Sequence, residues 1–191
     1  MRCGDRIETL RWGEVELTLR RKADEAAAAG DTDPERELRA AADALGRRAA
    51  PVAASYEAVR GSMSSGPERT RAMEAEIARA REDAASGQFD SAELTSLFRN
   101  GREGERVYVL GILQARPDLA SADLVLDAIR GPRSPFEQYH SLLLAERALN
   151  HLSDAERAAV TSAVERAAES WRFKRDSDRA AIARRIIGRA R

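Results

Sequence analysis

The stretch GERVYVLGILQARPDLASADLVLDAI, residues 104–129, decides the fold class of this chain. It contains two apolar segments joined by a short turn at Pro117. In the first segment, Val107, Leu110 and Leu113 recur three residues apart, which is the spacing of one helix face. Ser121 precedes the second segment, in the position of a helix N-cap. The stretch therefore predicts two short helices connected by a turn.

The composition extends this prediction to the whole chain. Hydrophobic residues make up 43% of the 191 residues, and much of that fraction is alanine, the best helix former. Aromatic residues, which strands favour, make up only 5%. We therefore expect an all-α protein, either a multi-helix bundle or a short α-solenoid. A short extended segment is possible within the first 20 residues, where apolar and polar residues alternate.

Helix start and stop signals divide the chain into two regions. The first region, residues 1–87, has the pattern of long helices, over residues 14–29, 33–60 and 67–86. The second region, residues 88–191, has shorter helices from Asp90 onward, with N-caps at Ser121, Ser134 and Ser153. We therefore predict an N-terminal long-helix region and a C-terminal short-helix region. Whether they pack as one body stays open at this point.

The balance of charge bears on possible partners. The chain has 32 basic and 32 acidic side chains, so its formal net charge is zero. This balance argues against bulk electrostatic binding to nucleic acid. Basic residues are concentrated in 171–191, a pattern typical of a solvated helix face that complements the C-terminal end of the helix dipole. We therefore expect no nucleic-acid partner.

Cysteine usage and hydropathy bear on the compartment. Cys3 is the single cysteine, so an internal disulfide and a thiolate metal cluster are both excluded. The sequence has no run of 18 apolar residues and no apolar signal-peptide core at its start. These features favour a cytoplasmic protein.

The segment around the opening stretch resembles a known architecture. Arg106, Val107, Leu110, Pro117 and Ile129 have the pattern of a helix pair in a HEAT-like α-solenoid, and the likeness covers about residues 100–170. The high arginine and alanine content is typical of an actinobacterial protein. The chain resembles helical accessory domains of actinobacterial signalling or defence proteins. The resemblance implies stacked helix pairs and a role in binding other proteins.

Residues that carry chemistry are few. Glu137 and His140 lie three residues apart, a pairing found in metal-binding bundles, but those bundles need it twice. We interpret Glu137 as the reciprocal partner of Ser134 in a capping box. No nucleotide-binding glycine motif is present, and two histidines give little material for a catalytic triad. We therefore predict no enzyme activity, no catalytic or metal-binding residues and no cofactor.

Two small clusters are candidates for contact with a partner. Tyr56, Glu57 and Arg60 lie close together on one predicted helix, as a recognition patch or as an intrahelical pair beside a tyrosine. The second cluster lies on the helix that follows Ser134 and consists of Phe136, Tyr139 and His140. On that helix we expect Leu143 and Leu144 to face the core and His140 to lie at its rim, where polar aromatic residues anchor interfaces.

These observations predict a non-enzymatic helical domain for protein–protein interaction or regulation. Its partner would be another protein or another domain of a larger polypeptide, and a homo-oligomer is also possible. The alternative hypothesis is a membrane-proximal or ligand-sensing helical domain cut from a longer chain. In that case membrane contact would occur at the N-terminus, where Trp12 stands among arginines.

Overall fold

The computed structural model describes residues 32–170 and 177–189, and this part of the chain contains helices and turns but no strand. The prediction of an all-α protein is confirmed. The helix predicted over residues 14–29 and the possible extended segment lie outside the described residues. The α-helices are α2 (Thr32–Ser62), α3 (Pro67–Ser86), α4 (Ser91–Asn100), α5 (Glu103–Ala115), α6 (Ala122–Arg130), α7 (Pro135–Ala148), α8 (Asp154–Ser170) and α9 (Asp178–Arg189). Two short 3₁₀ turns are η1 (Pro117–Leu119) and η2 (Leu149–His151).

The chain divides into two compact units, Met1–Leu45 and Gly46–Arg191. In the first unit, the described residues form the beginning of α2. The second unit contains the rest of α2 and all the helices from α3 to α9. The predicted regions 1–87 and 88–191, a division by helix length, stay a prediction.

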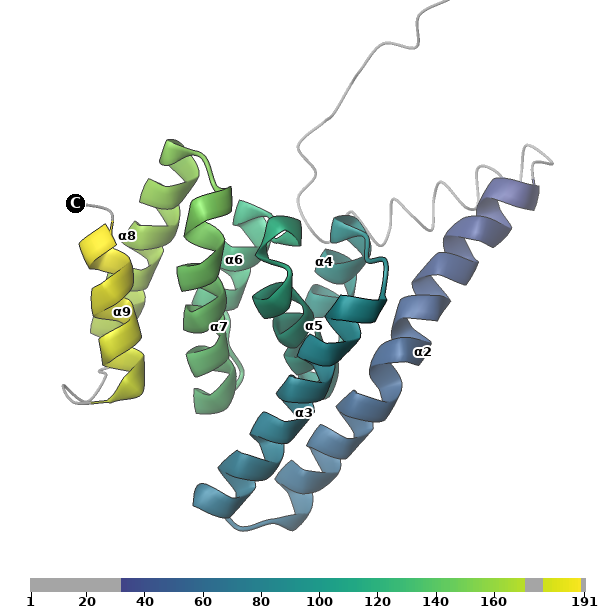
Figure 1. Cartoon of the computed structure of the whole chain (residues 1–191), viewed down its shortest axis with the longest axis horizontal. Coiled ribbons are helices and arrows are strands. Elements are labelled where there is room, and N and C mark those ends of the chain that lie inside the picture. Colours follow the sequence, from purple (N-terminus) through teal and green to yellow (C-terminus); the bar gives the residue numbers. More distant parts are fainter. Residues whose placement is uncertain (1–31, 171–176, 190–191) are drawn as a thin grey trace, which may run out of the picture. The chain divides into compact units, whose positions relative to one another are not determined.

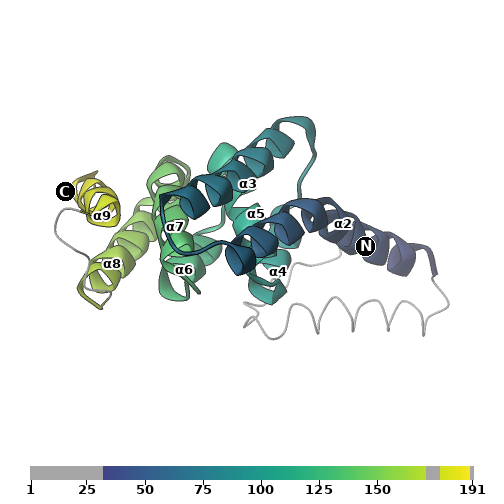
Figure 2. The same cartoon turned by 90° about the horizontal axis from the view of Figure 1, so that it is seen from below.

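Within the second unit, consecutive helices form pairs that stack on one another. The pairs are α4 with α5, α6 with α7, and α8 with α9 (Figure 1). Between pairs, α7 packs against both α5 and α9, while α6 packs against α8 (Figure 2). Side-chain caps begin the short helices: Asp90 accepts hydrogen bonds from two backbone amides of α4, and Ser121 accepts one from Leu124 in α6. These caps fix the residues at which the short helices begin.

Helix α5 is the centre of the second unit. It packs against α3, α4 and α7, and every residue from Arg106 to Gln114 is buried. Two glycines let other helices approach it closely. A Cβ atom at Gly111 would lie 2.5 Å from the Cβ of Ala80 on α3, and one at Gly104 would lie 2.4 Å from the carbonyl oxygen of Ala53 on α2. Neither position has room for a side chain unless a neighbouring helix moves.

The buried face of α7 differs from the prediction. Leu144 is buried as expected, but Leu143 is only half-buried, and His140, expected at the rim, is fully buried. The inward residues in the first half of the helix are polar: Glu137, His140 and Ser141. The prediction was wrong because it assumed that polar side chains face solvent, whereas Glu137 and His140 find hydrogen-bond partners inside the protein.

The capping box predicted at Ser134 is half right. Its hydroxyl accepts a hydrogen bond from the Glu137 backbone amide at 3.2 Å, as expected for an N-cap. The Glu137 carboxylate, however, accepts from the amide of Arg133, one residue before the predicted partner, and from the side chain of Arg106 on α5. The attraction of a buried guanidinium accounts for this change. The Ser153–Glu156 capping box forms in both directions as predicted.

Candidate functional site

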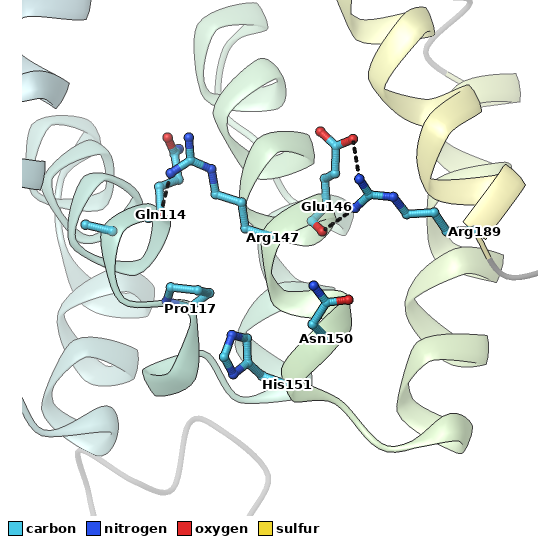
Figure 3. Close-up of a pocket in the computed structure, with 8 residues that line it drawn as sticks. Gln114, Pro117, Glu146, Arg147, Asn150, His151 and Arg189 are labelled. Carbon is cyan, nitrogen blue, oxygen red and sulfur yellow. Dashed lines mark hydrogen bonds and ion pairs between the residues drawn. The ribbon is translucent and has the colours of Figure 1, made fainter.

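An open groove lies where the C-terminal ends of α5 and α7 meet the end of α9 (Figure 3). Its volume is about 560 Å³ and it opens widely to solvent. The lining residues are Gln114, Ala115, Pro117, Glu146, Arg147, Asn150, His151 and Arg189. Three segments that are far apart in the sequence therefore build one depression in the surface.

Hydrogen bonds hold the charged side chains of the groove. Arg147 donates from Nη1 to the backbone oxygen of Gln114 at 2.6 Å. Arg185 binds the Glu146 carboxylate through two hydrogen bonds of 2.6 and 2.9 Å. Arg189 donates to the Glu146 backbone oxygen at 3.4 Å and forms an ion pair with the Glu146 carboxylate at 3.9 Å (Figure 3). The hydrogen bonds from Arg185 lower the pKa of Glu146. The carboxylate is thus ionised at neutral pH and already paired.

Gln114 connects the groove to a buried polar network, and its side chain fixes the orientation of His140. Arg81 donates to Gln114 Oε1 at 2.7 Å, so the Gln114 amide nitrogen faces His140. That nitrogen lies 3.1 Å from the His140 backbone oxygen and 3.3 Å from the ring Nδ1. Because an amide nitrogen only donates, Nδ1 accepts and the ring proton of neutral His140 is on Nε2.

The other side of the His140 ring completes this assignment. Nε2 lies 3.0 Å from Oε1 of Glu74 on α3, a good distance for donation to a carboxylate. Burial lowers the pKa of His140 below its ordinary value of 6.5, and the positive charge of Arg81 adds to this effect, while Glu74 opposes it. A protonated ring would also place its Nδ1–H against the amide donor of Gln114. Both effects keep His140 neutral at neutral pH.

We expect the stability of the protein to fall as the pH decreases below about 6.5. The unfolded chain takes up a proton on His140 near its ordinary pKa, whereas the folded chain resists protonation. The stabilisation is therefore complete above 6.5 and is lost below it, by at most about 1.4 kcal/mol per pH unit. Urea unfolding at pH 7.5 and 5.5 measures the difference in the free energy of unfolding.

The control for this prediction is the other histidine. His140→Gln should flatten the change between the two pH values, while His151→Gln, at an exposed position, should leave it as in the wild type. An equal pH dependence in the wild type and His140→Gln would contradict the assignment of His140 as the titrating group.

The structure places the first predicted contact cluster partly in the interior. Tyr56 is fully buried; its hydroxyl donates to Glu103 on α5 at 3.0 Å, and Arg60 forms an ion pair with the same carboxylate. Burial raises the pKa of Tyr56 to about 12, although the hydrogen bond from Arg60 opposes the rise. Glu57 is half-buried and lies 3.3 Å from Arg102. Tyr56 therefore cannot contribute to a recognition patch directly, because it is buried and its hydroxyl is used within the fold. A contact role for Glu57 and Arg60 stays a prediction.

The two predicted clusters meet through aromatic contacts. The rings of Tyr56 and Phe136 are 5.7 Å apart, those of Phe136 and His140 are 4.4 Å apart, and Tyr139 stands edge-on to His140 at 5.0 Å. His140 is buried and cannot contact a partner directly, so its predicted surface role is also corrected. Phe136 and Tyr139 are half-buried, and their role in contact stays a prediction.

The pairing of Glu137 with His140 is not a single site in the structure. Glu137 binds Arg106, whereas His140 binds Glu74 and Gln114. Among residues 32–170 and 177–189, no group of three or more His, Cys, Asp or Glu residues is arranged to hold a metal ion. The same residues include no helix long and apolar enough to cross a membrane.

Sequence reasoning missed most of the groove and the network. Glu74, Arg81 and Arg147 stand on faces that their helices expose in part, so no local pattern singled them out. Gln114 did carry a signal, since it is a polar residue at the end of the apolar run of α5. Arg189 belongs to the basic segment 171–191, whose pattern is typical of a solvated helix face.

Comparison with protein-family models, with curated proteins and with solved structures finds no match for this chain. The function of the chain is therefore inferred from the geometry of its second unit.

Proposed function

We propose that this chain is a non-enzymatic helical interaction module of the HEAT-like kind, with a regulatory or accessory role. The observation that carries the proposal is the open groove at the ends of α5, α7 and α9, one helix from each of the three stacked pairs. Stacked helix pairs commonly present binding surfaces of this type, because residues from successive repeats line up along one edge. The expected occupant is a segment of another protein or of another domain.

The buried polar residues support an architectural role over a catalytic one. Glu137, His140 and Gln114 each have hydrogen-bond partners within the fold. A general acid or base needs access to a substrate proton. These side chains are fully or almost fully buried and are used to join α3, α5 and α7. Their chemistry is that of a rigid scaffold for a surface site.

Peptide-display selection tests the proposed function. The immobilised chain should enrich a recurring sequence motif from a random peptide library, and a synthetic peptide with that motif should bind saturably at one site per chain. Hydrogen-exchange protection on binding should map to the second unit. The same selection on an unrelated helical protein of similar size is the control.

A selection that enriches nothing beyond the control would contradict the proposal. So would peptides that bind equally well to the chain unfolded in urea, because a module must recognise its partner through its folded surface.

A further inference from the structure

We propose that the groove at the ends of α5, α7 and α9 binds an acidic polypeptide segment through Arg147 and Arg189. This inference rests on the proposed interaction function and names the class of partner. The charge of the lining is its first support. Arg147 and Arg189 are cationic. The acidic lining residue, Glu146, is held by two hydrogen bonds from Arg185 just outside the groove and lies 3.9 Å from Arg189. The lining together with Arg185 thus has an excess of positive charge.

Two arginines that bind the same residue, Gln114, supply the second argument. Arg81 and Arg147 both donate to Gln114, one to the side-chain oxygen and the other to the backbone oxygen. Burial lowers the pKa of Arg81, and the positive charge of Arg147 lowers it further, while Glu74 opposes the change. Two like charges are therefore held close together, and a carboxylate arriving beside Arg147 would relieve their repulsion.

The shape of the groove favours a peptide over a small molecule. Pockets for small ligands enclose most of the ligand surface, whereas this groove opens widely to solvent. An extended segment can cross the ends of the three helices and remain exposed on its outer side. Asn150 at the edge of the groove offers both a donor and an acceptor to a peptide backbone. Ala115 and Pro117 add a small apolar surface beside the charges.

Fluorescence anisotropy with designed peptides tests this inference. The probes are a labelled ten-residue peptide rich in Asp and Glu, the same peptide with Asn and Gln in their place, and one with Lys. We expect the acidic peptide to bind with an affinity that decreases as salt is added. Its affinity should exceed that of the neutral peptide by about tenfold or more, which is the effect of one charge-assisted contact. The lysine peptide should not bind.

Variants assign the binding to the groove. Arg189→Gln alters an exposed side chain. It should lower the affinity for the acidic peptide about tenfold without changing the melting temperature of the protein. Arg147→Gln should lower the affinity to a similar extent. Because Arg147 also donates a hydrogen bond to the backbone oxygen of Gln114, the melting temperature of this variant is measured as well as its affinity. Arg189→Glu should reduce the affinity for the acidic peptide further. Arg130→Gln, an exposed arginine at the end of α6, is the matched control and should bind like the wild type.

The outcomes separate this inference from the proposed function. Selected peptides that bind tightly but ignore charge, or that are unaffected by Arg147→Gln and Arg189→Gln, would overturn the acidic-segment inference and leave the interaction module standing. A labelled oligonucleotide that binds more tightly than the acidic peptide, with the same loss in Arg189→Gln, would overturn it in favour of nucleic acid. If no peptide of any class binds, both proposals fail.

Discussion

Arg106→Met will lower the free energy of unfolding by about 3–5 kcal/mol, because it leaves the carboxylate of Glu137 buried without its cation. Arg106 joins α5 to α4, to α7 and to Gly131, the residue that follows α6. Its Nε donates to Glu137 at 2.7 Å, and its terminal nitrogens donate to the backbone oxygens of Phe98 and Gly131, each at 3.0 Å. The guanidinium also stacks 3.9 Å from the centre of the Phe98 ring. Both charged groups are almost completely withdrawn from water.

The companion variant separates the ion pair from simple loss of packing. Arg106→Met combined with Glu137→Met removes both buried charges, so it should be more stable than Arg106→Met alone. Equilibrium unfolding in urea measures all three proteins. Arg157→Met is the surface control, because its partner Asp154 is exposed. This substitution should lower the free energy of unfolding by less than about 1 kcal/mol. A double variant less stable than the single one would show that the charge of Glu137 was not the cause.

Gly104→Ala and Gly111→Ala will each lower the free energy of unfolding by about 1–3 kcal/mol, the usual cost of overpacking a core. At Gly104 the new Cβ would lie 2.4 Å from the carbonyl oxygen and 2.8 Å from the Cα of Ala53. Those are backbone atoms, so α2 itself would have to move. At Gly111 the nearest atom is the Cβ of Ala80, at 2.5 Å. Alanine normally stabilises a helix relative to glycine by about 1 kcal/mol, so a loss at either position is diagnostic.

The two glycines should respond differently to a second change. Ala80→Gly removes the atom that meets Gly111→Ala, so the double variant should lose less stability than the sum of the two single losses. Ala53→Gly should give no such relief to Gly104→Ala, because the clash there is with the backbone. Gly46→Ala, in a helix with nothing within 4 Å of the new Cβ, is the control and should leave stability unchanged or raise it. Additive losses at Gly111 and Ala80 would contradict the close approach of α3 and α5.

The sequence alone determined the features that depend on neighbouring residues. Its alanine-rich, aromatic-poor composition predicted helices throughout, and the described residues are helical. The start of α3 at Pro67 and the N-caps at Ser121 and Ser134 were predicted because a cap bonds to an amide two or three residues away. Such contacts are complete within one turn of the chain, so no knowledge of the fold was needed.

Only the tertiary structure decided which polar residues face inward and where the groove forms. Nothing local distinguishes the buried His140 from an exposed histidine, since its partner Glu74 lies 66 residues away in the sequence. Glu137 became part of the core only because α7 packs beside Arg106 on α5. The groove likewise requires the ends of α5, α7 and α9 to meet. Burial of a polar group depends on a partner that folding supplies, and the spacing along the chain does not encode that partner.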